Sequence, residues 1–284
     1  MEPRDLDAVL AAHPGDAEEV VSADLDAAAR APVDADHLDA ALAALELTTL
    51  EPTDGPARVR ALAERALRPD PEDAAAPTVA GVCTWPDLVG EVAQALEGTP
   101  VAAVSVAGAF PHARTTDAVA AAEVAHARQA GAAEVDVVLD RGALRTAGAP
   151  AAAARLGRLR EAAGEGVLKV ILETGALADA HEIRRAAWTA VLAGADAIKT
   201  STGTVTPAAT LPATRLLLEV ARDAEAGLGR RVAVKPAGGI RTAAHAASLV
   251  VLARRVRGHA GAEPPRLRIG ASSLVDALVT ARAR

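Results

Sequence analysis

The sequence predicts an α/β fold, a (β/α)8 barrel of the TIM-barrel type with an extra N-terminal helical segment. The chain has 284 residues, and a single barrel of this kind typically takes about 250. Eight short β-like runs are each followed by a longer helical pattern, which is the strand and helix count of such a barrel. A doubly wound open sheet is the alternative, but no GxGxxG follows the first run, and polar residues are spread over the ends of many runs.

Residues 1–36 are acidic and carry weak helical patterns at 6–10 and 17–30, so we expect an N-terminal extension that is partly helical or disordered. The barrel domain is expected over residues 37–284, and its first helix, at 37–44, would begin with Asp36 as the cap. Runs of apolar residues predict strands at 46–49, 78–83, 101–106, 134–139, 167–173, 197–200, 231–235 and 266–269. Helical periodicity predicts helices at 57–67, 86–96, 117–130, 151–163, 178–192, 211–226, 243–256 and 274–283.

The composition limits the function classes. Aromatic residues are almost absent, with two Trp, one Phe and no Tyr, so the core must consist of Ala, Val and Leu. The net charge of −7 gives no sign of a nucleic-acid-binding surface. Cys83 is the single cysteine, which excludes a disulfide framework, and we expect it to fill space at the end of the second strand. Without a signal-peptide-like or membrane-spanning run, we expect a cytoplasmic protein that binds neither nucleic acid nor membrane.

Lysine is the rare cation of this chain. Of 30 Lys and Arg residues, only Lys169, Lys199 and Lys235 are lysines, and all three lie in predicted strands. Arg stays protonated, whereas a desolvated Lys beside another cation can lose its proton and attack a carbonyl carbon to form a Schiff base. The alternative is a codon bias that replaced most lysines by Arg and left the others in structural ion pairs.

Strand alternation groups these polar residues inside the barrel. Lys199 and Lys235 lie near the ends of the sixth and seventh predicted strands, which are neighbours at the face where barrel active sites lie. Burial and a protonated Lys235 would both lower the pKa of Lys199. Buried charges must be neutralised, so we expect Asp136 and Glu46 to pair with the lysines. We also expect Asp136 to shuttle protons and Lys169 to support the network from deeper in the barrel.

Two glycine-containing turns follow the last two predicted strands. The first contains Gly238, Gly239, Ile240 and Arg241, and the second contains Gly270, Ala271, Ser272 and Ser273. Gly203 lies in a further turn after the sixth strand. Barrel enzymes often bind phosphate at such turns through backbone N–H groups. Ordinary tight turns with Ser as a helix cap are the alternative. We expect no metal site, because only His112 among the histidines follows a predicted strand.

Several motifs together resemble those of the deoxyribose-phosphate aldolases, which are class I, Schiff-base aldolases with a (β/α)8 barrel. The similarity runs from about residue 42 to residue 279. The matching stretches, in chain order, are LELTTL, GVCTWP, AFPHA, AAEVDVVLDRGAL, LKVILETG, GADAIKTSTG, VKPAGGIRT and IGASSLV. The resemblance implies reversible cleavage of 2-deoxy-D-ribose 5-phosphate to acetaldehyde and D-glyceraldehyde 3-phosphate, a reaction of deoxyribose catabolism.

The resemblance also implies roles for individual residues. Lys199 would form the Schiff base, Asp136 would transfer protons, and Lys235 would perturb the pKa of Lys199. The two glycine-containing turns would hold the phosphate, with Thr200 and Thr204 among the substrate contacts. Sugar phosphates and aldehydes are the implied ligands, no metal or organic cofactor is implied, and a homodimer is expected at the level of the family.

The chain departs from the family pattern close to this site. Glu46 stands where the family usually has Asp, and the longer side chain would displace the carboxylate that pairs with Lys235. Thr204 stands where some members have a phosphate-binding Lys, and the chain has no Tyr to assist proton transfer from a C-terminal tail. Two alternatives therefore stay open: a related class I aldolase acting on another aldehyde, with or without a phosphate group, and a catalytically silent paralogue that binds sugar phosphates.

Overall fold

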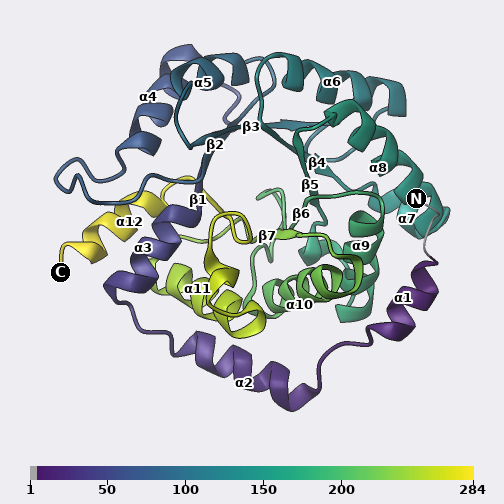
Figure 1. Cartoon of the computed structure of the whole chain (residues 1–284). Helices are drawn as coiled ribbons and strands as arrows, with labels where there is room; N and C mark the ends of the chain where they lie inside the picture. The colour runs from purple at the N-terminus through teal and green to yellow at the C-terminus, as the bar shows by residue number, and fades with distance from the viewer. Residues whose placement is uncertain (1–4) are drawn as a thin grey trace.

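The computed structural model describes residues 5–284. Its eight strands are parallel and hydrogen-bonded in the order β7-β6-β5-β4-β3-β2-β1-β8, and helices surround them (Figure 1). The strands are β1 (Leu45–Thr48), β2 (Gly81–Thr84), β3 (Ala102–Ala107), β4 (Glu134–Val138), β5 (Val167–Ile171), β6 (Ala197–Lys199), β7 (Ala233–Lys235) and β8 (Ile269–Ala271). The predicted (β/α)8 barrel is confirmed, and each strand overlaps its predicted run.

The barrel closes between β7 and β8 through isolated bridges rather than through a continuous ladder. Val234 pairs with Leu267, and Ala237 pairs with Gly270, both in the parallel sense. The first half of the last predicted strand lies at this seam. The regular part of β8 therefore begins later than the sequence pattern indicated.

The helices outside the barrel cover the strands. They are α4 (Pro56–Leu67), α5 (Val89–Ala95), α6 (Asp117–Gln129), α7 (Arg141–Thr146), α8 (Ala149–Ala163), α9 (Ala180–Leu192), α10 (Leu211–Leu228), α11 (Ala243–Arg257) and α12 (Leu274–Arg282), with 3-10 turns at Thr174–Ala176 and His259–Ala262. Within residues 5–284, none of the helices is long and apolar enough to cross a membrane.

Helix α7 is absent from the sequence prediction, because its six residues are too few to show helical periodicity. Its start is fixed by Asp140, whose carboxylate accepts a hydrogen bond from the N–H of Ala143 (2.9 Å). Its end is separated from α8 by Gly148, which has a φ of 84° that favours glycine.

The layer between strands and helices forms the main hydrophobic core. Outward-facing strand residues such as Leu47, Val135 and Ile198 have no exposed surface and pack against the helices. Trp188 of α9 is buried with them, and the other core residues are Ala, Val, Leu and Ile, close to what the composition predicts. Because a one-residue slip would turn this face inward, the core fixes which strand residues point into the barrel.

The inside of the barrel is partly apolar and partly charged. Cys83, Val104 and Val106 of β2 and β3 form a small buried cluster, and the Cys83 thiol lies next to the carboxylates of Glu46 and Asp136. Burial raises the pKa of the Cys83 thiol to about 12. The side chain fills space, as predicted, and the thiol stays protonated.

The N-terminal extension packs on the outside of the barrel. Helix α1 (Leu6–Ala12) contacts α9, and α2 (Glu18–Ala29) contacts α10 and α11, along the lower edge of Figure 1. The two predicted helical patches are therefore confirmed, and the described part of the extension forms packed helices rather than a disordered segment. Residues 1–4, which belong to the predicted extension, lie outside the described residues.

Helix α3 (Ala35–Ala44) packs against α11 and α12 and leads into β1. The prediction that Asp36 caps this helix is wrong. The cap is Asp34, whose carboxylate accepts a hydrogen bond from the N–H of His37 (3.0 Å). Asp36 lies in the first turn, where its side chain pairs with Arg254 instead.

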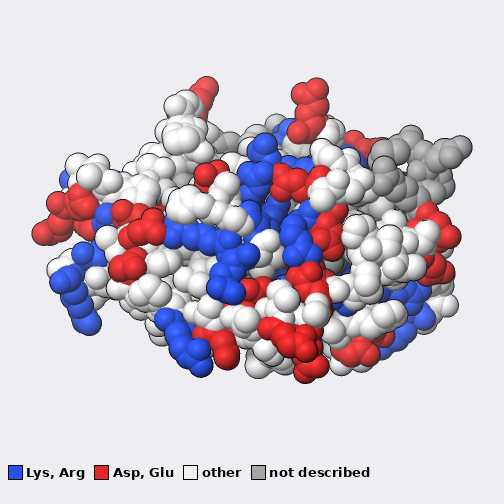
Figure 2. Space-filling view, turned by 60° about the horizontal axis from the view of Figure 1, so that its bottom comes forward, with Lys and Arg blue, Asp and Glu red and all other residues white. Residues whose placement is uncertain are grey.

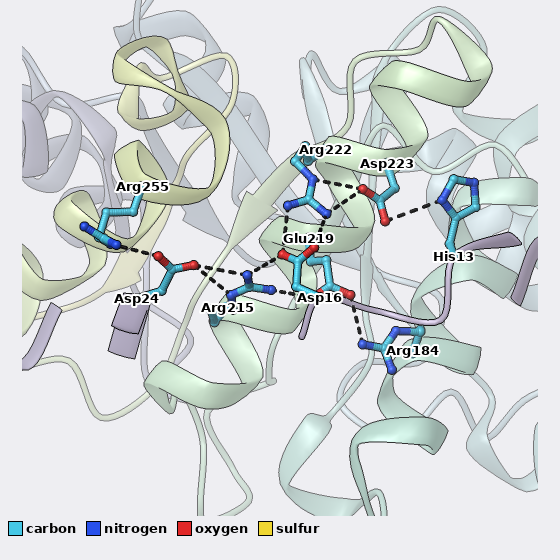
Figure 3. A network of polar contacts seen from close by, with 9 residues as sticks. All are labelled: His13, Asp16, Asp24, Arg184, Arg215, Glu219, Arg222, Asp223 and Arg255. Atoms are coloured by element: carbon cyan, nitrogen blue, oxygen red, sulfur yellow. Dashed lines mark hydrogen bonds and ion pairs between the residues drawn. The ribbon is translucent and has the colours of Figure 1, made fainter. Parts of the chain in front are cut away.

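A network of ion pairs fastens the extension to the barrel (Figure 3). At its centre, Arg215 of α10 is 2% exposed and bonds the carboxylates of Asp16, Asp24 and Glu219. Asp24 of α2 also accepts a hydrogen bond from Arg255 of α11 (2.8 Å). Three further residues extend the network. Arg184 pairs with Glu219, and Arg222 pairs with Asp16 and Asp223. His13 lies beside Asp223 and stacks on Trp188.

The surface over this region shows the same pairing of charges. In Figure 2, where the lower edge of Figure 1 is turned toward the viewer, positive and negative side chains are interleaved. Neither sign forms a broad continuous patch on this face. On this face, charged side chains thus lie next to side chains of the opposite sign.

Removal of the central cation of this network is expected to destabilise the protein. In Arg215→Gln, Asp24 and Glu219 stay buried but lose their shared partner. Breaking a buried pair costs about 3–5 kcal/mol. We expect a value near the lower end, because Asp24 keeps Arg255 and Glu219 keeps Arg184. Urea unfolding followed by circular dichroism measures the change.

The control for this experiment is Arg30→Gln, which breaks an exposed pair with Asp26. We expect it to change the free energy of unfolding by less than about 0.5 kcal/mol. Equal free energies of unfolding for Arg215→Gln and Arg30→Gln would contradict the stabilising role of the buried network.

Cys83 is expected to be unreactive in the folded protein, because its thiol is fully buried and its pKa is raised to about 12. Ellman's reagent should release no thionitrobenzoate from the native protein and one equivalent after unfolding in guanidinium chloride. Rapid labelling of the native protein would show that Cys83 reaches the solvent at the barrel mouth.

Candidate active site

Three lysines from neighbouring strands converge on one carboxylate inside the barrel. Lys169, Lys199 and Lys235 come from β5, β6 and β7, and each is almost fully buried. The Nζ atoms of Lys199 and Lys235 both lie 2.7 Å from Oδ2 of Asp136. The Nζ atom of Lys169 lies 2.9 Å from its Oδ1. Asp136 therefore lies at the centre of the three lysines, and it points into the barrel, as strand alternation predicted.

Two further carboxylates complete this network. Glu46 of β1 bonds the ammonium group of Lys235, and its other oxygen lies 3.3 Å from Nζ of Lys169. Lys169 also lies 2.6 Å from Glu134, which in turn accepts a hydrogen bond from Arg268 (2.9 Å). Lys169 and Glu134 lie closer to the N-terminal ends of the strands than Lys199 does, so Lys169 joins the network from the end of the barrel opposite the mouth.

Glycine on both neighbouring strands makes room for the long side chain of Glu46. Glu46 lies beside Gly81 of β2 and beside Gly270 of β8 in the strand register. A Cβ atom at Gly81 would lie 3.4 Å from Cγ of Glu46, and one at Gly270 would lie 3.1 Å from Cε of Lys235. Glu46 therefore reaches Lys235 directly, and the network with this lysine is intact.

The network contains one more cation than it contains carboxylates. The carboxylates are Glu46, Glu134 and Asp136, and the cations in contact with them are Lys169, Lys199, Lys235 and Arg268. Buried charges are costly unless they are paired, so the group becomes neutral if one lysine loses its proton. Lys199 contacts one carboxylate, whereas Lys235 contacts two and Lys169 contacts three. Of the three lysines, Lys199 therefore has the weakest stabilisation of its positive charge by carboxylates.

The pKa directions agree with this assignment. Burial is the main cause that lowers the pKa of Lys199 below its ordinary value, and Lys235 adds to it, while Asp136 opposes it. Burial also disfavours the charged forms of Lys169 and Lys235, but the carboxylates around them, with Asp136 foremost, outweigh burial and raise both pKa values. Lys199 is thus the candidate nucleophile of the three, and the raised pKa of Lys235 keeps that lysine an ammonium group.

Asp136 is held as a carboxylate. Burial alone would raise its pKa, but the ammonium groups of Lys169, Lys199 and Lys235 hold the pKa well below the ordinary value. A carboxylate within hydrogen-bond distance of Nζ of Lys199 can accept a proton from the amine during attack on a carbonyl carbon.

Lys199 opens onto a cavity of about 260 Å³ at the C-terminal end of the barrel. Seven of the predicted substrate-binding residues line this cavity, namely Gly203, Gly238, Gly239, Ile240, Gly270, Ser272 and Ser273. The two glycine-containing turns after β7 and β8 therefore share one cavity with the candidate nucleophile.

Two of the predicted substrate contacts do not line this cavity. Thr200 is fully buried, and its hydroxyl group bonds both the N–H and the carbonyl oxygen of Ala237, so it joins the end of β6 to the turn after β7. Thr204 is exposed and bonds Thr202, whose hydroxyl group also donates to Glu173 (2.6 Å). Thr200 thus positions the turn rather than facing the cavity.

The sequence analysis assigned no binding role to six further residues that line the cavity. They are Thr48, Leu50, Thr202, Ala237, Arg241 and Ala271. Arg241 is the last residue of the predicted turn after β7, and its guanidinium group makes no ion pair with any described residue. A cation within a predicted phosphate-binding turn was the available signal.

Two clusters within residues 5–284 have the spacing of metal ligands, but their other contacts do not suit a cation. Glu46, Cys83 and Asp136 approach one another, but the two carboxylates already bond lysines, and the thiol has a pKa of about 12. In the second cluster, which contains His37, Asp34 bonds that histidine and Asp36 bonds an arginine on α11. His112 belongs to neither cluster.

The sequence pattern of the DeoC/LacD family aldolases matches residues 40–278, which is most of the chain. A candidate deoxyribose-phosphate aldolase from Coccidioides immitis is 28% identical, with a TM-score of 0.70 over 89% of this chain and 88% of that chain. The deoxyribose phosphate aldolase from Aeropyrum pernix is 25% identical, with a TM-score of 0.69 over 93% and 97% of the two chains. A candidate deoxyribose-phosphate aldolase from Toxoplasma gondii, 22% identical with a TM-score of 0.75 over 87% and 94%, shares the fold.

The family match spans all eight strands, and so it includes every residue of the buried lysine–carboxylate network. A buried amine beside a carboxylate, open to a cavity at the C-terminal end of a barrel, suits an aldolase that works through a Schiff base. The chain therefore belongs to the DeoC/LacD family of aldolases, which are carbon–carbon lyases.

Proposed function

We propose that this aldolase reversibly cleaves 2-deoxy-D-ribose 5-phosphate to acetaldehyde and D-glyceraldehyde 3-phosphate through a Schiff base on Lys199. The observation that carries the proposal is the position of Lys199. It is the surplus cation of the buried network, and it opens onto the cavity lined by the turns after β7 and β8. The names of the Coccidioides immitis and Aeropyrum pernix structures point to the same substrate.

The chemistry begins with neutral Lys199, whose Nζ attacks the aldehyde carbon C1 of the open-chain sugar. Asp136 lies 2.7 Å from this nitrogen and accepts its proton, and a water molecule relays protons as the carbinolamine loses water. The resulting iminium group draws electrons from the C2–C3 bond as the C3 hydroxyl group loses its proton. Glyceraldehyde 3-phosphate leaves, and protonation of the enamine at C2 followed by hydrolysis releases acetaldehyde and restores Lys199.

Lys235 contributes without reacting. Its ammonium group lies between Glu46 and Asp136, and its charge lowers the pKa of Lys199. Because its own pKa is raised, it keeps this charge at neutral pH. In this proposal Lys199 is the nucleophile, and Lys235 is a permanent positive charge beside it.

The phosphate group would lie at the turns after β7 and β8. Gly239 and Gly270 bring backbone close to the cavity, and Ser272 and Ser273 can donate hydroxyl hydrogen bonds. Arg241 adds a cation without an ion-pair partner among the described residues, which offsets the absence of a lysine at Thr204.

Borohydride trapping tests the nucleophile. Sodium borohydride added with deoxyribose 5-phosphate should leave a reduced adduct on the peptide that contains Lys199, and mass spectrometry should find none on Lys169 or Lys235. Lys199→Arg keeps the charge but has no amine nucleophile, so it should give no adduct and no turnover.

Asp136→Asn should lower kcat by about 10²–10⁴-fold, as is typical of acid–base groups. An adduct on Lys235, or full activity of Lys199→Arg, would contradict the proposal.

The same assay separates the proposed substrate from the two alternatives. We expect kcat/KM for deoxyribose 5-phosphate to exceed that for deoxyribose by at least about tenfold, because hydrogen bonds to a charged group are worth about 1.5–3 kcal/mol. Arg241→Gln should lower only the value for the phosphate ester. Equal values for both sugars would favour an aldolase for non-phosphorylated aldehydes. Binding of the phosphate ester without turnover would favour a silent paralogue.

A further inference from the structure

A second cavity lies on the same side of the barrel, among the loops after β3, β4 and β5. Its volume is about 500 Å³, which is within the usual range for small-molecule sites of roughly 300–1,000 Å³. No residue lines both this cavity and the one that contains Lys199. The second cavity is therefore separate from the candidate active site.

Four arginines line this second cavity. Arg114 comes from the loop after β3, Arg141 and Arg145 come from α7, and Arg185 comes from α9. Arg141 and Arg185 are half-buried, and the other two are exposed. Elsewhere in residues 5–284, most arginines bond a carboxylate or a carbonyl oxygen, as Arg155, Arg215 and Arg282 do. None of the four guanidinium groups at this cavity has such a partner within the same residues.

Two carboxylates also line the cavity, but each accepts a hydrogen bond from a backbone N–H group. Asp140 accepts a hydrogen bond from the N–H of Ala143 at the start of α7 (2.9 Å). Glu182 accepts one from the N–H of Ala178 before α9 (2.9 Å). Each holds local backbone rather than an arginine, so the cavity keeps an excess of positive charge with unused N–H donors.

We propose that this cavity binds a small phosphorylated ligand that carries at least two negative charges. Guanidinium groups donate paired hydrogen bonds whose geometry matches phosphate oxygens, and they stay protonated at all relevant pH values. Arginines that come from separate loops surround a tetrahedral anion better than a single fork does. The volume leaves room for more than one phosphate group or for an organic part.

The proposal does not depend on the identity of the aldolase substrate. It concerns residues outside the catalytic network, and its test is a binding measurement rather than an activity assay. The full chain carrying Gly239→Asp serves as the background, because a carboxylate in the turn after β7 disfavours anions at the first cavity. Gly239 has a φ of 76°, which strains any residue with a side chain but which Asp adopts more often than most, and a Cβ atom there would meet no atom within 4 Å.

In this background, inorganic pyrophosphate is titrated by isothermal calorimetry. We expect one saturable site whose affinity falls as salt increases. Arg141→Gln with Arg145→Gln should weaken binding by at least about tenfold, because each charged hydrogen bond lost costs about 1.5–3 kcal/mol. Arg145→Gln alone, an exposed position, should weaken binding by a smaller factor and serves if the double variant does not fold.

The matched control is Arg58→Gln with Arg284→Gln, which removes the same charge at exposed arginines that also lack partners within residues 5–284. It should change the dissociation constant by less than about twofold, because distant exposed charges are screened. Absence of pyrophosphate binding would overturn the proposal. Equal losses in the control and in the α7 variants would also overturn it, because they would show a response to net charge only.

Discussion

The need to neutralise charge inside the barrel governs the candidate active site. Three carboxylates and four cations meet in a largely buried space, and the charges balance when one of the three lysines loses its proton. Lys199 has the fewest carboxylate contacts and the lowered pKa, so it is the group that gives up its proton. The proton balance thus follows from the number of charges that the strands point inward, and Glu46 matters because its carboxylate, together with Asp136, raises the pKa values of Lys169 and Lys235.

Much of this arrangement follows from sequence pattern alone, because a strand has a period of two and parallel strands end at the same side of a barrel. Those rules bring Lys199, Lys235 and Asp136 together without a structure. They do not give the side-chain contacts. Thr200 was predicted to contact the substrate but bonds the backbone of Ala237, whereas Arg241, in the predicted turn but without an assigned role, lines the cavity. Local sequence does not show which of two neighbouring side chains faces a cavity.

The N-terminal extension marks a second limit of sequence reasoning. Its helices could be predicted from their periodicity, but the partners that hold them could not. Arg215 occupies an ordinary position in a helical pattern, yet it bonds Asp16 and Asp24, which lie far from it in the sequence. Helices α10 and α11, to which the extension is fastened, follow β6 and β7, the strands that carry Lys199 and Lys235. The extension thus packs on the outer side of the barrel segments that carry Lys199 and Lys235.

The most direct test of the charge argument is a titration of the three lysines by NMR, which the scarcity of lysine makes simple. Protein labelled with ¹³C at the lysine ε-carbons should give three signals from the folded chain, and the one that is lost in Lys199→Arg belongs to Lys199. We predict that this signal titrates below the ordinary lysine pKa of 10.5, whereas those of Lys169 and Lys235 titrate above it. A Lys199 signal that titrates at or above 10.5, together with the other two, would contradict the account.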